Sequence, residues 1–330
     1  MVASNGTGNG GGRRPAKPHA VVIAYPYQGH VIPAAPLALR LAARGFAVTF
    51  VNTESVHEQT ARALGVDRHR YDIFAGARAS SDHKEPLDVR YELVSDGFPL
   101  GFDRSLNHDQ FKEGELHVLA AHVEDLLRRL VVDPASTCLV ADTFFVWPAT
   151  LAKKFGVPYV SFWTEPALIF NLYYHMDLSR RARPLQLLQG PAAEGHHHVD
   201  GLAHAALAGF LTHCGWNSVL ESVWAGVPML CFPLLTDQFT NRRLVVREWR
   251  VGVPIGDRGK VFPDEVSARI QGVISGQEGK ELRQALRKVT AKLKAAAAPG
   301  GSSQRSFDDF VDELTHRCAC GGGGGRTLMT

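Results

Sequence analysis

The segment His213–Ser218, which reads His-Cys-Gly-Trp-Asn-Ser, combines polar side chains with the sequence pattern of a helix start. The apolar run Gly209–Thr212 precedes it, and a helical pattern covers Asn217–Ala225, with Asn217 or Ser218 as the expected cap. A helix N-terminus presents unpaired backbone N–H groups and the positive end of the helix dipole, and both attract phosphate. The segment therefore predicts an anion site.

Polar residues around this turn match the other parts of a nucleotide sugar. His213 adds a side-chain donor for a phosphate, and Glu221 lies one turn into the helix, where a carboxylate accepts hydrogen bonds from ribose hydroxyls. Asp237 and Gln238 follow the next apolar run, Val227–Phe232, at the strand ends where α/β proteins bind ligands. We expect these two side chains to hold the hydroxyls of a sugar.

A second candidate group lies in the N-terminal half. His30 follows the first apolar run, Ala20–Tyr25, and an imidazole at that position, with a pKa near neutrality, takes the proton of a hydroxyl. Asp142 comes directly after the run Thr137–Ala141, so it also lies at a strand end. We expect Asp142 to orient the His30 ring and to stabilise it once protonated.

The elements that position these residues alternate along the chain, which predicts an α/β fold with parallel sheets covered on both faces. The expected strands are Ala20–Tyr25, Phe46–Val51, Thr137–Ala141, Val157–Phe162, Gly209–Thr212 and Val227–Phe232. The expected helices are Pro33–Arg44 after a Gly29-His30 turn, Trp147–Phe155, Asn217–Ala225, one from near Asp237, one over Pro263–Ala298, and a short one with Phe307, Phe310 and Leu314. The segment 178–203 shows no convincing strand.

The composition excludes several classes of protein. The 330 residues carry 36 Lys plus Arg against 33 Asp plus Glu, a net charge of +3, which argues against a general nucleic-acid binder. The five cysteines do not form a dense disulfide framework, which favours a reducing compartment. No apolar stretch is long enough to span a membrane. We therefore expect a soluble, cytoplasmic protein with no integral membrane association.

The His-Cys-Gly-Trp-Asn-Ser string, the following Glu221, a Gly-Val-Pro string and the closing Asp-Gln pair resemble the signature box of plant secondary-product glycosyltransferases. The strings Gly-His-Val-Ile-Pro around His30 and Val-Ala-Asp ending at Asp142 are similar to the same family. These are UDP-dependent glycosyltransferases of family 1, with the GT-B fold of two facing Rossmann-like domains. The resemblance implies inverting sugar transfer from a UDP-sugar to a small-molecule hydroxyl, with His30 as base and Asp142 as its partner.

The resemblance also implies the substrates. Gln238 favours glucose as the sugar, and the acceptor is a hydroxylated small molecule such as a phenolic or terpenoid compound. No cofactor or metal is implied, because UDP-glucose is a co-substrate and backbone amides with His213 stabilise the diphosphate. The implied UDP-sugar-binding residues are His213, Gly215, Trp216, Asn217, Ser218, Glu221, Asp237 and Gln238.

One region departs from the family pattern. The box of the family opens with Trp-x-Pro-Gln, but Gly195 and His198 stand at the Trp and Gln positions here. The segment 178–203 is also too short for several βα units, since a single βαβ crossover takes about 30 residues. We therefore expect that an internal block is missing and that activity is impaired. The expected division is 1–18 disordered leader, 19–177 acceptor domain, 178–203 junction, 204–317 partial UDP-sugar domain and 318–330 disordered tail.

Two other functions compete with sugar transfer. A non-catalytic relative that only binds the small molecule is favoured by Gly195 and His198 in place of the family's Trp and Gln. A nicotinamide-dependent dehydrogenase requires G-x-G-x-x-G after the first strand, which the stretch Gln28–His30 does not provide. The oligomeric state and the identity of the acceptor stay open.

Overall fold

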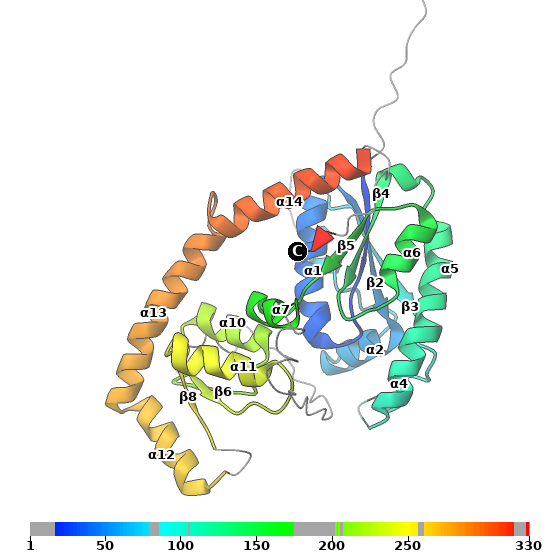
Figure 1. The fold of residues 1–330 in the computed structure, drawn as a ribbon. Helices are drawn as coiled ribbons and strands as arrows, with labels where there is room; N and C mark the ends of the chain where they lie inside the picture. The colour runs from blue at the N-terminus through cyan, green and yellow to red at the C-terminus, as the bar shows by residue number, and fades with distance from the viewer. Residues whose placement is uncertain are drawn as a thin grey trace, which may run out of the picture.

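Two parallel sheets form the framework of the chain, one in each half (Figure 1). The computed structural model describes residues 17–79, 86–104, 106–174, 202, 204, 207–256, 261–319 and 328–329. Every strand pair in both sheets is parallel, as the near-continuous apolar runs predicted. The α/β class is therefore confirmed.

The first half alternates strands with helices. Its strands are β1 (His19–Ile23), β2 (Ala47–Thr53), β3 (Val89–Val94), β4 (Thr137–Asp142) and β5 (Tyr159–Phe162). Its helices are α1 (Gln28–Ala43), α2 (Glu54–Ala63), α3 (Ala75–Ala79), α4 (His108–Gly114), the π-helical segment η1 (Glu115–Leu119), α5 (Ala120–Leu130), the short 3-10 turn η2 (Pro134–Ser136), α6 (Pro148–Phe155) and α7 (Ala167–Tyr174).

The strand order of this sheet has a topological switch point between β1 and β4. The order is β3-β2-β1-β4-β5-β9, so the chain winds outward in both directions from the β1–β4 pair. The helices that follow these two strands, α1 and α6, pack on opposite faces of the sheet. Ligands of open α/β sheets bind at such a switch point, outside the carboxyl ends of the strands. His30 follows β1 and Asp142 ends β4, so both residues lie there.

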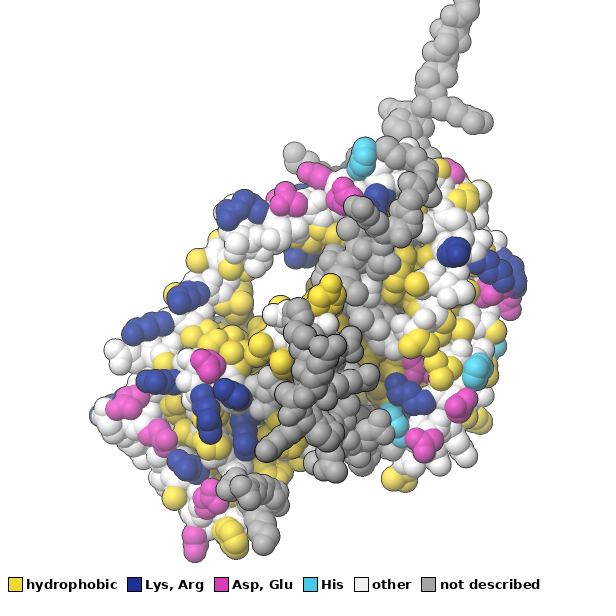
Figure 2. All heavy atoms as spheres, in the orientation of Figure 1, with side chains coloured by type: hydrophobic (Ala, Val, Ile, Leu, Met, Phe, Trp, Pro, Cys, Tyr) yellow, Lys and Arg dark blue, Asp and Glu magenta, His cyan; other side chains and the backbone are white. Residues whose placement is uncertain are grey.

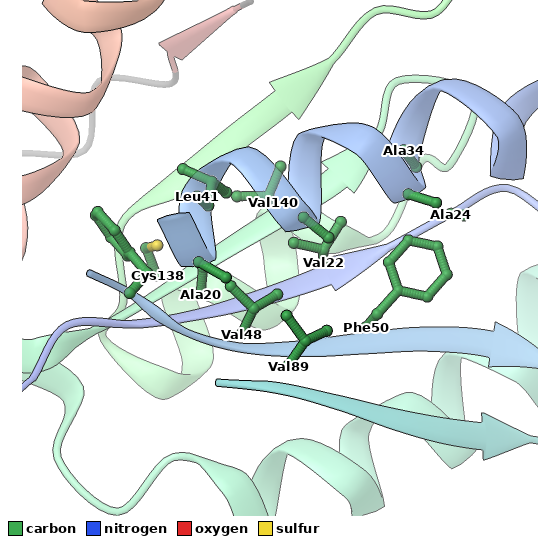
Figure 3. Packing of buried hydrophobic residues seen from close by; sticks show 14 of the residues in the cluster. Ala20, Val22, Ala24, Ala34, Leu41, Val48, Phe50, Val89, Cys138 and Val140 are labelled. Carbon is green, nitrogen blue, oxygen red and sulfur yellow. The ribbon is translucent and has the colours of Figure 1, made fainter. Parts of the chain in front are cut away.

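Two apolar layers hold this sheet. On one face, Leu41 and Ala34 of α1 pack against Val22, Val48 and Val140 of the strands, all buried (Figure 3). On the other face, α5 and α6 cover a second buried cluster that includes Leu126, Leu139 and Leu151. Each buried Val or Leu side chain contributes roughly 1.5–3 kcal/mol, so the strand ends that carry His30 and Asp142 rest on a rigid support.

The second half is smaller and has its own sheet, with the order β6-β7-β8. Its elements are β6 (Phe210–Thr212), α10 (Trp216–Ala225), β7 (Met229–Cys231), α11 (Gln238–Arg243), the π-helical η3 (Leu244–Glu248), β8 (Gly252–Pro254), α12 (Pro263–Ile274) and α13 (Gln277–Ala297). Among the described residues, β6 pairs only with β7, and Leu211 on it is 63% exposed. An exposed strand of this kind agrees with the expectation that the second unit is incomplete.

Two predicted helices have different bounds in the structure. The helix predicted from Pro33 begins at Gln28, so Gly29 and His30 belong to its first turn and not to a loop. The single helix predicted over 263–298 is broken into α12 and α13 at Gly276. A Cβ atom on Gly276 would lie 2.7 Å from the carbonyl oxygen of Gly272, so this tight corner requires a glycine.

The C-terminal helix α14 (Ser302–Ala319) returns to the first half, where Figure 1 shows it above the first sheet. It is longer than predicted, and Val311, Leu314 and Cys318 are buried in the same cluster as α1. α14 therefore continues across the expected boundary between 317 and 318, and its apolar stripe completes the core of the N-terminal half. Beyond it, β9 (Leu328–Met329) pairs with β5.

The first sheet contains one strand, β3, that is not among the expected strands. β3 carries the charged residues Arg90 and Glu92, which interrupt an apolar run. Charged side chains are common on edge strands, where they discourage pairing with other chains, and β3 is the edge of the first sheet.

Basic and acidic side chains are interspersed over the face shown in Figure 2. Within the described ranges, no helix has the length and apolarity to cross a membrane.

Candidate active site

His30 and Asp142 form a hydrogen-bonded pair at the switch point. The Nδ1 atom of His30 lies 2.8 Å from Oδ2 of Asp142, and the side chains are 17% and 1% exposed. The second carboxyl oxygen, Oδ1, accepts the backbone N–H of Phe144 at 2.9 Å, which fixes the orientation of the carboxylate. Because a carboxylate only accepts, the proton of His30 is assigned to Nδ1. The Nε2 lone pair is then the basic site.

Thr164 is a third member of this group that the sequence analysis did not identify. Its Oγ1 atom lies 2.9 Å from Nδ1 of His30. With the Nδ1 proton shared towards Asp142, the threonine hydroxyl acts as a second acceptor for the same N–H, and its own hydrogen remains to be donated. Thr164 follows β5, which pairs with β4. The sequence feature that could have identified Thr164 is its position directly after a strand that neighbours β4.

Aromatic rings hold the imidazole in place. The ring of Tyr25 lies 5.1 Å from that of His30, and the ring of Phe144 meets it edge-on at 4.9 Å. Tyr25 is 1% exposed, whereas Phe144 is 37% exposed. The imidazole is therefore packed on an inner side by Tyr25, and Phe144 extends the apolar surface next to it towards solvent.

A buried carboxyl group supports Tyr25 from behind. The hydroxyl of Tyr25 donates to Oε2 of Glu115 at 2.7 Å, and Nζ of Lys112 contacts both that hydroxyl and, at 3.3 Å, the same carboxyl oxygen. Burial raises the pKa of Glu115 to about 7, against the attraction of Lys112. Glu115 is the first residue of the π-helical segment η1, a type of helix irregularity that is frequent at functional sites.

The predicted anion turn is tightly built. Cys214 has a positive φ of 66°, its N–H donates to Oγ1 of Thr212, and its carbonyl accepts from Nδ2 of the buried Asn241. The imidazole of His213 lies over Gly215, where an added Cβ atom would be 2.4 Å from Nε2. Only a glycine at position 215 lets the ring occupy this place at the start of α10.

The cap of α10 differs from the prediction. The N-cap is Gly215 and not Asn217 or Ser218, and it makes no side-chain cap hydrogen bond. Asn217 instead donates from Nδ2 to the carbonyl oxygen of Gly29 in α1, at 2.8 Å. The reason is that the tight turn before α10 places Asn217 inside the helix, opposite the first half. Backbone N–H groups at this helix end therefore keep their capacity to bind an anion.

Three other box residues lie along the same helix start. Ser218 is 2% exposed and Glu221 is half-buried. The ring of Trp216 packs against that of Trp249 at 6.0 Å, within the apolar cluster of the second half. The indole is therefore part of the packing under α10, which leaves the backbone of Trp216, at the first helical position, as its contribution to a ligand site.

Asp237 and Gln238 lie after β7, as predicted. Burial raises the pKa of Asp237, whose Oδ2 accepts from Asn241 at 2.6 Å and whose charge interacts with His213. The side-chain oxygen of Gln238 accepts the backbone N–H groups of Leu234 and Leu235, both at 2.8 Å. The amide nitrogen of Gln238 is thus the part of this side chain that can donate to a ligand.

Within the described part of the chain, the hydrogen bond from Asn217 to Gly29, beside His30, connects the two predicted groups. The carboxyl ends of both sheets thus face the same region. Gly195 and His198, which carry the predicted departure from the family pattern, lie outside the described residues. Within the described ranges, no group of three His, Cys, Asp or Glu side chains is placed to hold a metal ion.

Sequence comparison links this arrangement to one family. A family model described as UDP-glucoronosyl and UDP-glucosyl transferase matches residues 197–282, which contain the box. UDP-glycosyltransferase 86A1 of Arabidopsis thaliana is 33% identical, over 91% of this chain and 95% of the relative. That alignment spans 472 positions, of which this chain fills about 300 (91% of 330 residues), so about 170 positions of the aligned span face gaps in this chain. Such gaps agree with the predicted missing block.

Solved structures share the fold. The UGT71G1 structure of Medicago truncatula, complexed with UDP-glucose, superposes with a TM-score of 0.68 at 15% identity, over 91% of this chain and 98% of that one. The UGT2 structure of Phytolacca americana, complexed with UDP-2fluoro-glucose and pterostilbene, gives a TM-score of 0.65 at 16% identity, over 90% and 99% of the two chains. The two-domain GT-B prediction is therefore confirmed, with an incomplete second domain.

Proposed function

Because the chain belongs to the plant UDP-glycosyltransferases, we propose that it transfers glucose from UDP-glucose to a hydroxyl of a small molecule, with His30 as the base. The observation that carries this proposal is the His30–Asp142 pair at the switch point of the first sheet, in contact with the start of α10 through Asn217. The relative complexed with UDP-glucose supports the choice of donor.

The acceptor step uses the free nitrogen of His30. Its Nε2 takes the proton of the acceptor hydroxyl while the hydroxyl oxygen attacks the anomeric carbon of the sugar from the face opposite UDP. The bond between the anomeric carbon and the diphosphate oxygen breaks, and UDP leaves with that electron pair. Asp142, which is buried and accepts from Nδ1, stabilises the imidazolium that forms. The anomeric configuration is inverted.

The donor lies along the start of α10. Backbone N–H groups there, with His213, Gly215, Asn217 and Ser218, hold the diphosphate and stabilise the charge on departing UDP. Nδ2 of Asn217 carries two hydrogens, so it can keep the carbonyl of Gly29 and donate the second to a phosphate oxygen. Glu221 binds the ribose. Sugar hydroxyls are held by the backbone of Trp216 and by the side chains of Asp237 and Gln238.

The acceptor is a hydroxylated molecule with an aromatic ring. Phe144 contacts His30 and stacks with Trp163, the ring centroids being 6.3 Å apart. Phe170 and Tyr173 of α7 extend this surface from Trp163. A flat apolar acceptor placed on these rings presents its hydroxyl to the imidazole. The relative bound to pterostilbene supports this class. We propose a cytoplasmic location, on the spacing of the cysteines in the sequence.

Calorimetric titration with UDP and UDP-glucose, on a chain shown to be folded by circular dichroism, tests the donor site. Saturable binding followed by glucoside formation with a phenolic acceptor is the expected result. His30→Ala is the matched variant, expected to bind UDP-glucose like the unchanged chain while losing turnover. A folded chain that binds neither UDP nor UDP-glucose would overturn the proposal.

A second function is favoured by the incomplete second half. The sheet there has three strands among the described residues, and about 170 aligned positions of the Arabidopsis relative have no counterpart. The first half, with Phe144 and Trp163 beside His30, is complete enough to bind an acceptor without any donor. Saturable binding of a phenolic acceptor by a chain that does not bind UDP would identify a non-catalytic small-molecule binder.

A further inference from the structure

Glu165 is a partly buried residue that none of the roles above uses. It follows Thr164 in the loop between β5 and α7, and its Oε2 atom is fully buried without a hydrogen-bond partner in the described part of the chain. Buried polar atoms in native proteins are nearly always hydrogen-bonded, so an exception calls for a specific explanation. A ligand group that is absent from the protein alone would supply the missing partner.

The loop that carries Glu165 is fixed on both sides. On one side, Thr164 is hydrogen-bonded to His30. On the other, Nε1 of Trp163 donates to the carbonyl oxygen of Pro166, which also accepts the N–H of Ile169 at the start of α7. The backbone that carries Glu165 is therefore held in place, one residue after the threonine that is bonded to His30.

The electrostatic neighbours of Glu165 come from both halves of the molecule. Burial, together with smaller contributions from the nearby carboxyls of Asp237 and Asp142, raises the pKa of Glu165 to about 8. Asp142 is the hydrogen-bonding partner of His30, the proposed base, in the first half. Asp237 follows β7 in the second half. Tyr173 of α7 shares this environment, since both Glu165 and Asp237 raise the pKa of its hydroxyl.

Under the proposed function, the two substrates meet between Asp142 and Asp237. The proposed base at His30 reaches the acceptor hydroxyl, and Asp237 is proposed to hold the transferred sugar. A carboxyl that retains its proton near neutral pH carries one O–H donor and one acceptor oxygen. A sugar hydroxyl can accept from such a group while it donates to a neighbouring carboxylate.

We propose that Glu165 is a further sugar-positioning residue, whose buried carboxyl hydrogen-bonds a hydroxyl of the glucose moiety of UDP-glucose opposite Asp237. This inference rests on the proposed function, because it requires a UDP-sugar at the start of α10. Glu165 makes no contact with the reacting atoms. It fixes the rotation of the sugar so that the anomeric carbon faces the acceptor oxygen.

Paired titrations with UDP and UDP-glucose test this role, because only UDP-glucose carries the sugar. Glu165→Ala is expected to weaken UDP-glucose binding about tenfold and to leave UDP binding within about twofold of the unchanged chain. Glu165→Gln keeps a donor and an acceptor at nearly the same volume and is expected to retain most of the affinity. Glu165→Asp shortens the side chain by one methylene, so we expect the same loss of UDP-glucose affinity as for Glu165→Ala. If Glu165→Ala does not fold, Glu165→Asp takes its place in the test.

Glu113→Ala is the matched control, since this glutamate lies on α4 with its side chain 73% exposed. It is expected to leave both affinities unchanged. Equal weakening of UDP and UDP-glucose by the substitutions at Glu165, or no weakening of either, would overturn the role of Glu165 and leave the proposed function standing. An unchanged chain that binds no UDP would overturn both.

Discussion

Asn217 donates to the carbonyl oxygen of Gly29 at 2.8 Å across 188 residues of sequence, and Pro33 is the reason that this carbonyl is available. In an α-helix the carbonyl of residue 29 would accept the N–H of residue 33. Proline has no backbone N–H, so the fourth residue after Gly29 cannot donate. The Gly29 carbonyl in the first turn of α1 is thus available as an acceptor, and Asn217 of the second half donates to it.

Removing the amide of Asn217 should destabilise the chain in a way that depends on residue 33. Asn217→Ala is expected to lower the free energy of unfolding by about 0.5–1.5 kcal/mol, because the Gly29 carbonyl loses its partner. In a Pro33→Ala background the new N–H of residue 33 takes that carbonyl, so the same substitution should cost at least about 0.5 kcal/mol less. Urea unfolding of the four chains measures the coupling.

Pro36→Ala is the control for this cycle, because it makes the same chemical change one turn later in α1, where the affected carbonyl belongs to Ile32. In that background Asn217→Ala should cost as much as in the unchanged chain. An identical cost in all three backgrounds would show that Pro33 does not control the contact between Asn217 and Gly29.

Asp142→Asn should abolish most turnover without loss of donor binding. The amide of an asparagine donates to Nδ1 of His30, which moves the imidazole proton to Nε2 and removes the basic lone pair. We expect kcat to fall about 10²–10⁴-fold, the usual contribution of a general base. Glucoside formation under saturating substrates, with calorimetry for UDP-glucose, makes the test. Asp125→Asn is the control, since the Asp125 side chain is 66% exposed, and it should leave kcat unchanged. A kcat within a few fold of normal for Asp142→Asn would refute the role of Asp142 as the partner of His30.

Glu115 should make the stability of the chain depend on pH. Its pKa is raised by burial from an ordinary value of 4.5 to about 7, so between these values the folded chain binds more protons than the unfolded chain. The free energy of unfolding should therefore fall as the pH rises from about 4.5 to about 7, by up to about 3 kcal/mol from this group. Glu115→Gln should flatten that part of the profile, measured by urea unfolding at several pH values.

Glu113→Gln serves as the control for the pH profile, because Glu113 is exposed on the preceding helix. It should keep the slope of the unchanged chain. A Glu115→Gln chain with an unaltered slope would mean that another group accounts for the pH dependence.

Leu314→Ala should test whether α14 is part of the core of the first half. Leu314 is 0% exposed and belongs to the same cluster as Leu41 of α1. Truncation of a buried leucine usually costs about 2–5 kcal/mol, because the transfer energy is lost and a cavity remains. Ile274→Ala on α12, where the side chain is 47% exposed, should change stability by less than about 0.5 kcal/mol. Thermal and urea unfolding compare the two, and equal effects would argue against the docking of α14.

Local patterns predicted much of the first sheet and the strand ends that carry His30 and Asp142. Buried parallel strands require nearly continuous apolar runs, so β1, β2, β4 and β5 were located within two residues of their observed bounds. β3 was not predicted, because an edge strand tolerates the charged residues Arg90 and Glu92, which interrupt its apolar pattern.

The chemistry of the individual residues follows from short stretches of sequence. An imidazole after β1, a carboxylate at the end of β4 and a glycine turn before α10 are local features, because strand ends and helix starts are specified by neighbouring residues. These features were sufficient to place His30, Asp142 and the box residue Asn217 in candidate sites, and the resemblance to a family rested on the same short strings.

Which of these residues contact one another depends on the folded arrangement of the whole chain. The contact of Thr164 with His30, the use of Asn217 as a bond to Gly29, and the orphaned oxygen of Glu165 all depend on how distant segments pack. The same holds for α14, whose apolar stripe finds its partner more than 250 residues earlier, in α1, with Arg44 bonded to Asp308. Hydrogen bonds and burial across such separations follow from the folded arrangement of both halves, which local periodicity does not contain.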